Sequence, residues 1–190
     1  MTPKLMNTRI LYEGWGRYVG MTVRLEDGAE VEREIEDHGR AIAVLPYDPE
    51  RRCALLVRQL RMGPLFAGVE NPYLLEAPAG IIEGEQPDET ARREALEEVG
   101  VRLSELQPVG VPFSTAGCSS ERIDMFLAPY SSSDRVESGG GAEGEHENIR
   151  VIEKPLDELL RMVRANELPD LKTIALVLLL LAHRPELFSA

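Results

Sequence analysis

The feature that constrains this chain most is a short segment, residues 80–101, in which glutamates recur at helical spacing. Glu94, Glu97 and Glu98 stand at positions i, i+3 and i+4, which places their side chains on one face of a helix. The small and apolar residues between them fall on a different face that can pack against a core. The segment predicts a helix over residues 87–99, because a proline opens it and a glycine follows it.

The clustering of these carboxylates is unfavourable without a counterion. Like charges at i, i+4 oppose each other by about 0.2–0.5 kcal/mol, and acidic groups near the carboxyl end of a helix also oppose its dipole. A bound cation reverses that penalty. Hard oxygen ligands on a rigid face suit Mg²⁺, which keeps several waters and shares its other positions with phosphate oxygens. The segment therefore predicts phosphoryl-transfer chemistry.

The rest of the chain has the pattern of a mixed α/β fold. Alternating apolar and polar residues around Asp27-Gly28 predict a solvent-facing β-hairpin over residues 21–35. We expect further strands at residues 41–45, 54–57, 73–77, 123–128 and 149–152, and further helices at residues 156–165 and 170–183. Between them, residues 131–148 form a glycine- and serine-rich acidic loop, and long loops in compact domains are usually functional or disordered.

Composition excludes several classes of function. A chain of 190 residues can bury a substantial core without metal or disulfide staples. The net charge of −12 repels nucleic acids and anionic membranes, and it suits divalent cations. Cys53 and Cys118 lack the spacing of a zinc site and the density of a disulfide framework, so we expect a cytoplasmic location. We expect neither a signal peptide nor a membrane span, because the apolar run at residues 174–182 is too short.

The acidic segment also carries a family resemblance. Residues 85–101 read E-x7-R-E-A-L-E-E-V-G-V. This resembles the signature of the Nudix hydrolases, G-x5-E-x7-R-E-U-x-E-E-x-G-U, in which U is a bulky aliphatic residue. Two positions depart from it: four residues instead of five separate Gly80 from Glu85, and Ala95 is small for its place. The shorter loop changes the expected position of Glu85 relative to Gly80, whereas the helix that follows keeps the spacing of the signature.

The resemblance implies roles for the residues of this motif. Glu94 and Glu98 take the positions of metal ligands, whereas Glu97 and Arg93 belong to the catalytic set, with Glu97 orienting ligands. The alternative is an acidic surface helix whose glutamates pair with Arg92 and Arg93.

The resemblance extends over residues 13–183 and is closest to the ADP-ribose and GDP-mannose pyrophosphatase branch. Residues 75–80 look like a loop of that branch in which the backbone carbonyl at the Ala79 position binds metal and Gly80 contacts substrate. Arg61 lies in a stretch similar to one that offers a guanidinium to the diphosphate, and planar guanidinium donors match phosphate oxygens. For Arg58, a surface salt bridge is the alternative role.

Two loops carry further implied site residues. Residues 115–122 resemble a Ser-Pro-Gly-Gly-x-Ser-Glu loop that contacts substrate and assigns that role to Glu121, although Ala116 and Cys118 depart from the pattern. Residues 145–151 are similar to a Glu-x-Glu-x-Ile-x-Val segment, which implies Glu145 as the water-activating base and Glu147 as a metal ligand. A divalent metal lowers the pKa of water, and a nearby carboxylate can take its proton. Glu143 is the competing residue for either role.

The N-terminal segment is implied to serve substrate binding and assembly. Trp15 resembles an aromatic platform for the nucleobase, and Arg33 and Glu34 resemble a polar pair that contacts substrate. Because these strands often cross to a partner subunit in the branch, a homodimer is implied. We therefore divide the chain into an N-terminal β segment, residues 1–40, and a Nudix domain, residues 41–190.

Together the resemblance implies a Nudix-type α/β/α sandwich with a mixed sheet and an N-terminal antiparallel hairpin. The expected reaction is Mg²⁺-dependent cleavage of a nucleoside diphosphate sugar, first of all ADP-ribose to AMP and ribose 5-phosphate, with Mn²⁺ as a substitute ion. GDP-mannose is the alternative substrate. Two other classes of function stay open: a catalytically silent Nudix domain that senses a nucleotide sugar, and a structural partner recruited through its acidic face.

Overall fold

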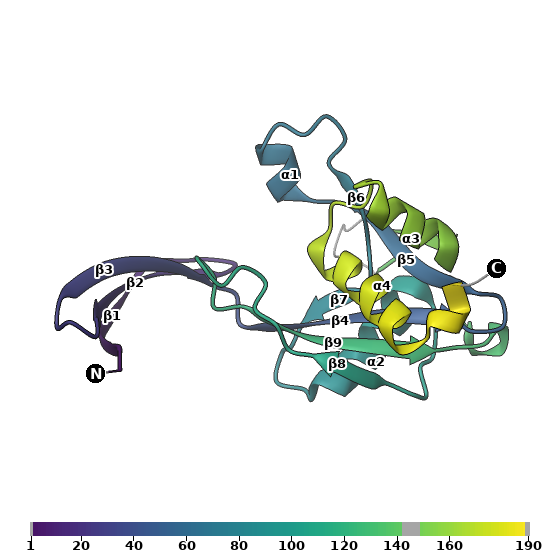
Figure 1. The fold of residues 1–190 in the computed structure, drawn as a ribbon, viewed down its shortest axis with the longest axis horizontal. Coiled ribbons are helices and arrows are strands. Elements are labelled where there is room, and N and C mark those ends of the chain that lie inside the picture. The colour runs from purple at the N-terminus through teal and green to yellow at the C-terminus, as the bar shows by residue number, and fades with distance from the viewer. Residues whose placement is uncertain (1, 142–148, 189–190) are drawn as a thin grey trace. The chain divides into compact units, whose positions relative to one another are not determined.

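The structure, a computed structural model, describes residues 2–141 and 149–188. The chain divides into two compact units (Figure 1): Met1–Ala41 together with Val111–Ile123, and Ile42–Gly110 together with Asp124–Ala190. Sequence analysis placed a boundary after residue 40, and it gave no sign that residues 111–123 group with the N-terminal segment.

The first unit is built on a three-stranded antiparallel sheet in the order β1-β2-β3. Its strands are β1 (Lys4–Glu13), β2 (Arg17–Arg24) and β3 (Glu30–Asp37). The β2–β3 hairpin is confirmed, and Gly28 in its turn has a φ of 87°, a conformation that favours glycine. β1 was not predicted, because its residues do not alternate strictly between apolar and polar, and all of them are exposed.

Residues 111–123 join the first unit through backbone contacts with the end of β3. The amide of Glu36 donates to the Cys118 carbonyl at 2.8 Å, and the amide of Ser120 donates to the Glu36 carbonyl at 3.0 Å. The Ser120 hydroxyl also donates to the Asp37 carboxylate at 2.7 Å. This long-range pairing explains why a linear division of the sequence missed the segment.

The second unit contains a mixed sheet in the order β10-β5-β4-β9-β8, with β6 also paired to β5 and β7 to β4. The predicted strands are confirmed; the two that sequence analysis missed, β7 and β8, are short, and β8 contains a proline. The strand bounds are β4 (Arg40–Asp48), β5 (Cys53–Leu60), β6 (Tyr73–Glu76), β7 (Ala79–Ile81), β8 (Gln107–Gly110), β9 (Arg122–Pro129) and β10 (Arg150–Pro155).

Three helices of the second unit match the predictions, and α1 (Met62–Phe66) adds one short turn. These three are α2 (Pro87–Val99), α3 (Leu156–Arg164) and α4 (Leu171–His183), and 3₁₀ turns cover Ser132–Asp134 and Pro185–Phe188. α2 begins with a capping box between Gln86 and Glu89 and ends at Gly100, whose φ is 72°. Among the described residues, no helix has the length and apolar character to cross a membrane.

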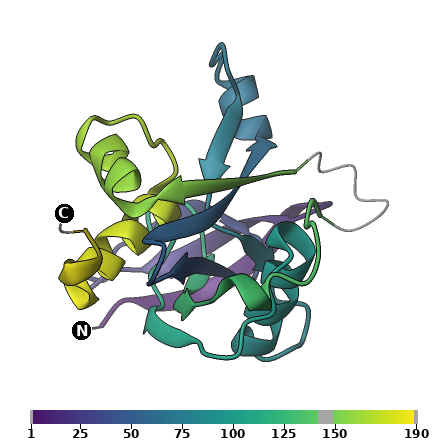
Figure 2. The same cartoon turned by 90° about the vertical axis from the view of Figure 1, so that its right-hand side faces the viewer.

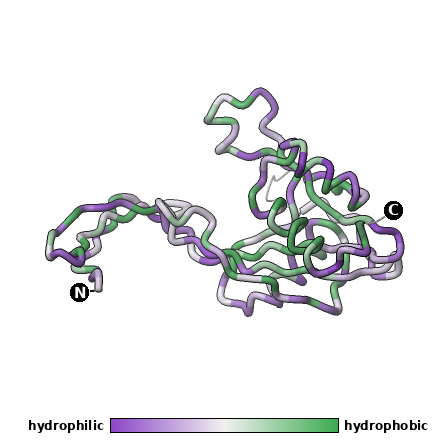
Figure 3. The backbone as a smooth tube through the Cα atoms, in the orientation of Figure 1, coloured by the Kyte–Doolittle hydropathy of each residue, from purple (hydrophilic) through white to green (hydrophobic). Residues whose placement is uncertain are grey.

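The core of the second unit lies on both faces of the sheet, as an α/β/α sandwich requires. Ile42 and Val44 of β4 pack in one buried cluster with Ala91 and Ala95 of α2. The alternate residue Ala43 is equally buried, so the opposite face must be covered too. Figure 2 shows α3 and α4 on the side of the sheet opposite α2, and Figure 3 shows α4 and the central strands as the hydrophobic part of the chain. The predicted fold class is therefore confirmed.

Candidate active site

The acidic face of α2 is partly withdrawn from solvent. Ala91, Ala95 and Val99 are fully buried, which fixes the rotation of the helix against the sheet. That rotation leaves Glu98 only 3% exposed, whereas the side chain of Glu94 is 13% exposed and more open to solvent. Buried carboxylates are costly unless hydrogen bonds or cations compensate them.

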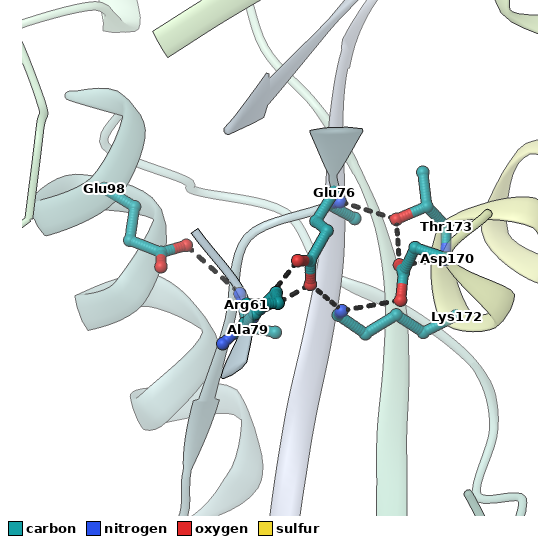
Figure 4. A network of polar contacts seen from close by, with 8 residues as sticks. Arg61, Glu76, Ala79, Glu98, Asp170, Lys172 and Thr173 are labelled. Carbon is teal, nitrogen blue, oxygen red and sulfur yellow. Dashed lines mark hydrogen bonds and ion pairs between the residues drawn. The ribbon is translucent and has the colours of Figure 1, made fainter. Parts of the chain in front are cut away.

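The Ala79–Gly80 backbone lies directly against these glutamates. The amide of Ala79 donates to Glu98 Oε2 at 3.1 Å (Figure 4). A Cβ added to Gly80 would lie 1.9 Å from Glu94 Oε1, so only glycine permits this approach without movement of Glu94. The structure thus brings together four residues that sequence analysis assigned to metal or substrate binding: Ala79, Gly80, Glu94 and Glu98.

Arg93 is surrounded by the glutamates of the same segment. Its guanidinium pairs with Glu94 at 3.0 Å, with Glu97 at 2.9 Å and, more loosely, with Glu85 at 3.5 Å. Burial opposes its charge, but the glutamates outweigh that effect and raise the pKa of Arg93. The buried hydroxyl of Thr90 donates to Glu85 at 3.0 Å and holds that carboxylate on the same side. Arg93 therefore offsets repulsion and fixes the positions of Glu94 and Glu97.

The oxygen donors at this place suit a hard divalent cation. Two carboxylates, Glu94 and Glu98, stand beside the backbone of Ala79, and carboxylate and carbonyl oxygens are the ligands that Mg²⁺ prefers. Within residues 2–141 and 149–188, no group of three or more His, Cys, Asp or Glu side chains is placed to hold a metal ion. The third predicted carboxylate ligand, Glu147, and the predicted base, Glu145, lie outside the described residues.

The residues that flank 142–148 are held at the carboxyl end of α2. The amides of Gly140 and Gly141 donate to the carbonyls of Glu98 and Glu97 at 2.9 and 3.1 Å. A Cβ on Gly140 would lie 3.8 Å from the Ile149 carbonyl oxygen, so the two flanks of the segment are close together. The amides of Gly140 and Gly141 thus complete the C-terminal hydrogen bonds of α2.

A second group of charges lies on the other side of the Ala79 backbone (Figure 4). Arg61 donates from Nε and Nη2 to the two carboxylate oxygens of Glu76, at 2.6 and 2.8 Å. Glu76 is completely buried. Burial favours its neutral form, but the hydrogen bonds from Arg61 and the charge of Lys172 outweigh burial and lower the pKa of Glu76. The predicted diphosphate ligand Arg61 is therefore held by an ionised partner.

Sequence analysis did not single out the partners of Arg61. Lys172, near the start of α4, donates to Glu76 and also to Asp170 at 2.9 Å. Asp170 in turn accepts from the amide of Thr173 at 3.0 Å and so caps the helix. One signal was available: Glu76 is a charged residue inside an otherwise apolar strand, and buried charges are usually paired.

Arg58 contributes to neither group of charges. Its guanidinium lies over the ring of Tyr73, 4.7 Å from the centroid, and one Nη contacts the Asn71 side chain at 3.4 Å. Both partners are on the chain between β5 and β6 or at its end. These contacts are cation–π and polar interactions at the surface.

Trp15, Arg33, Glu34 and Glu121 belong to the first unit, whereas the α2 residues belong to the second. Arg33 donates to the neighbouring Glu32 carbonyl at 2.7 Å. Glu34 accepts from the Tyr18 hydroxyl at 2.7 Å, and that hydrogen bond raises the pKa of the Tyr18 hydroxyl.

Glu121 is fixed through its backbone. Its amide donates to the Ser119 hydroxyl oxygen at 3.2 Å, and its carbonyl accepts from the amide of Ser114 at 3.1 Å. The carboxylate of Glu121 takes part in neither of these hydrogen bonds. The loop that resembles a substrate-contacting segment thus has its backbone held, and the role of its acidic side chain stays a prediction.

Trp15 lines a cavity of the first unit. The cavity has a volume of about 380 Å³, and Tyr12, Tyr18, Glu36 and His38 also line it. The Trp15 ring is tilted by 42° against His38 with centroids 4.7 Å apart, and the tryptophan is 83% exposed. A concave surface with several aromatic residues and few polar groups is typical of small-molecule sites.

Comparison with known proteins relates this geometry to a family. The family described as NUDIX domain matches residues 37–175. GDP-mannose pyrophosphatase of Cronobacter sakazakii is 34% identical over 178 residues, covering 92% of both chains, and that of Citrobacter koseri is 35% identical over 145 residues, covering 76% of this chain and 75% of the relative. A crystal structure of an ADP compounds hydrolase superposes with a TM-score of 0.78 at 17% identity, covering 97% of this chain and 95% of that one.

Proposed function

Because this chain belongs to the Nudix hydrolase family, we propose that it hydrolyses the pyrophosphate bond of a nucleoside diphosphate sugar. The observation that carries the proposal is the approach of the Ala79–Gly80 backbone to Glu94 and Glu98 of α2. Two carboxylates from one helix face that are partly withdrawn from solvent suit a divalent cation together with the phosphates that it binds. A silent sensor or a structural partner would not require this costly arrangement.

The metal ligands in this proposal are the Ala79 carbonyl, Glu94, Glu98 and Glu147. Mg²⁺ is the proposed ion, with Mn²⁺ as its substitute, and when bound it offsets negative charge on the diphosphate. Glu97 orients the ligands, and Arg93 holds Glu94 and Glu97 in place through the ion pairs described above.

Glu145 is the proposed general base. It belongs to residues 142–148, whose flanking residues are held at the carboxyl end of α2 by the hydrogen bonds of Gly140 and Gly141. Glu145 would take the proton of the attacking water as the P–O bond is cleaved.

Arg61 is the proposed diphosphate ligand, and the N-terminal unit is the proposed base-binding part. Trp15 stacks on the nucleobase in this proposal, and its exposure in an aromatic-lined cavity supports that role. Arg33, Glu34 and Glu121 make polar contacts with the substrate. Assembly as a cytoplasmic homodimer is part of the same proposal and rests on the family resemblance.

GDP-mannose is the first substrate candidate, because two relatives that are 34% and 35% identical are named GDP-mannose pyrophosphatase. ADP-ribose, the first expectation from sequence, is the second candidate. It rests on the resemblance of residues 115–122 and 145–151 to the ADP-ribose branch. The two nucleotides differ in the base edge that must be matched by hydrogen bonds, so a comparison of kcat/KM decides between them.

A substrate panel tests the proposal. The full chain with Mg²⁺ is incubated separately with GDP-mannose, ADP-ribose, NADH and a nucleoside triphosphate, and products are followed by chromatography. We expect the highest kcat/KM for GDP-mannose, with GMP and mannose 1-phosphate as products. A tenfold preference for ADP-ribose would reverse the order of candidates. Failure to cleave any diphosphate would contradict the proposal and favour the silent sensor.

A further inference from the structure

We propose that Glu76 is a positioning residue, which holds the guanidinium of Arg61 beside the Ala79–Glu98 contact so that it can bind a diphosphate. This inference rests on the proposed function and adds to it a residue that neither the Nudix signature nor the substrate loops contain. Its basis is a chain of polar contacts that joins Arg61 and β6 to α4, next to the contact between the Ala79 backbone and α2 (Figure 4).

The geometry of the Arg61–Glu76 pair fixes the direction of the guanidinium. Both carboxylate oxygens of Glu76 are used, one by Nε and one by Nη2, in a bidentate arrangement. Of the five N–H donors of a guanidinium, this pair uses two, and the other three point away from Glu76. The Arg61 side chain is 38% exposed, so a ligand from solvent can reach that outer edge.

Because Glu76 is fully buried, its charged side chain needs an explanation other than packing. It stands fully buried on β6, paired in register with the apolar residue Val57 of β5. A well-packed hydrophobic side chain at such a place is often as stabilising as a buried ion pair or more so. Retention of a carboxylate there is therefore explained by what it orients, namely the guanidinium of Arg61.

Arg61 and Lys172 keep Glu76 ionised, and Asp170 holds Lys172 in place. Lys172 lies between the two carboxylates and donates to both. Glu76 thus faces two cations, Arg61 and Lys172, while Asp170 is shared between Lys172 and the first turn of α4. Because each charge has a partner, the pair with Arg61 persists at neutral pH with no ligand bound.

The same network extends to the proposed metal-binding backbone. The buried hydroxyl of Thr173 accepts from the amide of Ala77 at 2.7 Å. Two residues later, Ala79 donates to Glu98. Glu76 directly precedes Ala77, so the same short stretch, residues 76–79, positions both the Arg61 guanidinium and the Ala79 amide. A displaced Glu76 would move the guanidinium relative to the α2 carboxylates, and a misplacement of 1 Å can cost about 10²-fold in rate.

The test compares Glu76→Gln with a matched control, Asp48→Asn. Asp48 is also a buried carboxylate of this sheet, and it accepts from the amides of Glu50 and Arg51. It pairs with Cys53 at the start of β5, whereas Glu76 pairs with Val57, so the two carboxylates are about 13 Å apart along the strand at 3.3 Å per residue. With GDP-mannose and Mg²⁺, we expect Glu76→Gln to lower kcat/KM by about 10–10²-fold, mainly through KM, since a binding contact is weakened. Asp48→Asn should stay within twofold of the unchanged chain.

A double-mutant cycle separates positioning from general stability. In an Arg61→Ala background, Glu76→Gln should cause no further loss of kcat/KM, because Glu76 acts through Arg61. Losses that multiply would overturn the proposal, as would a folded Glu76→Gln variant with unchanged kcat/KM. If Glu76→Gln does not fold, Glu76→Asp carries the same cycle, because it keeps the charge and shortens the side chain by one methylene.

Binding of GDP with Mg²⁺, measured by titration calorimetry, separates failure of this inference from failure of the proposed function. Weaker binding by Glu76→Gln than by the unchanged chain supports the positioning role even without turnover. Hydrolysis by the unchanged chain with equal binding and kinetics in both proteins would overturn the Glu76 inference alone. Neither hydrolysis nor GDP binding by the unchanged chain would overturn both.

Discussion

Two groups of charges flank the Ala79 backbone, and they differ in how they are balanced. On the α2 side, the carboxylates of Glu85, Glu94 and Glu97 share one guanidinium, that of Arg93. On the α4 side, Glu76 and Asp170 face two cations. The first group has an excess of negative charge that a metal can neutralise, whereas the second is complete by itself. The difference suggests that one group binds a cation and the other orients a fixed cation toward the substrate.

The largest expected effect comes from removing charge on the α2 side. Glu98→Gln should reduce Mg²⁺-dependent kcat by about 10³-fold or more, because an oxygen ligand loses its charge. The fold should persist, since the glutamine carbonyl can still accept from the Ala79 amide and repulsion on the helix falls. Steady-state kinetics at saturating Mg²⁺ and a thermal melt measure both effects. Near-normal turnover would mean that the α2 group does not bind the metal.

The proposed base gives the next largest effect. Glu145→Gln should lower kcat by about 10²–10⁴-fold, the usual contribution of general acid–base catalysis, and leave metal affinity unchanged. Calorimetric titration with Mg²⁺ provides the second measurement. If Glu147→Gln instead loses turnover and keeps metal affinity, the roles of Glu145 and Glu147 are exchanged.

A substitution at Gly80 tests how closely its backbone must approach the Glu94 carboxylate. Gly80→Ala should lower kcat/KM by about 10–10²-fold, because its Cβ would lie 1.9 Å from Glu94 Oε1 and force that carboxylate to move. Gly63→Ala is the control, since its Cβ would meet nothing within 4 Å. Equal kinetics for the two variants would show that Glu94 can shift without consequence.

The smallest effect concerns acid stability on the α4 side. Arg61 and Lys172 outweigh burial and lower the pKa of Glu76 below its ordinary value of 4.5. A lowered folded-state pKa contributes stability above pH 4.5 that is lost as the pH falls through the folded-state value. Denaturant midpoints should therefore fall more steeply below about pH 4.5 for the unchanged chain than for Glu76→Gln. Parallel pH profiles would show that the ionisation of Glu76 contributes nothing to stability.

The α2 side could be predicted from sequence because the residues that define it are close together in the chain. The helix bounds, the capping at Gly100 and the shared face of Glu94 and Glu98 all follow from residues within a few turns of one another. On the α4 side, the resemblance indicated Arg61 but not its partners, because Glu76 on β6 and Lys172 on α4 are far from Arg61 in sequence and meet it only in the folded chain.

The same distinction applies to the first unit. The β2–β3 hairpin was predicted from its turn and alternation, whereas β1 and the attachment of residues 111–123 depend on long-range backbone pairing. Such pairing leaves no periodic signal in the segments that form it. Local chemistry therefore predicted the helices and most strands, and it missed the contacts that join distant segments.

The most direct test of the central claim is the metal dependence of hydrolysis by the unchanged chain. GDP-mannose and ADP-ribose are offered first with excess EDTA and then with Mg²⁺ in excess over EDTA. The α2 group, with its surplus of carboxylates around Ala79, predicts no detectable cleavage in EDTA and full turnover once Mg²⁺ is restored. Cleavage that continues in EDTA, or no cleavage of either nucleotide sugar with Mg²⁺, would contradict the account.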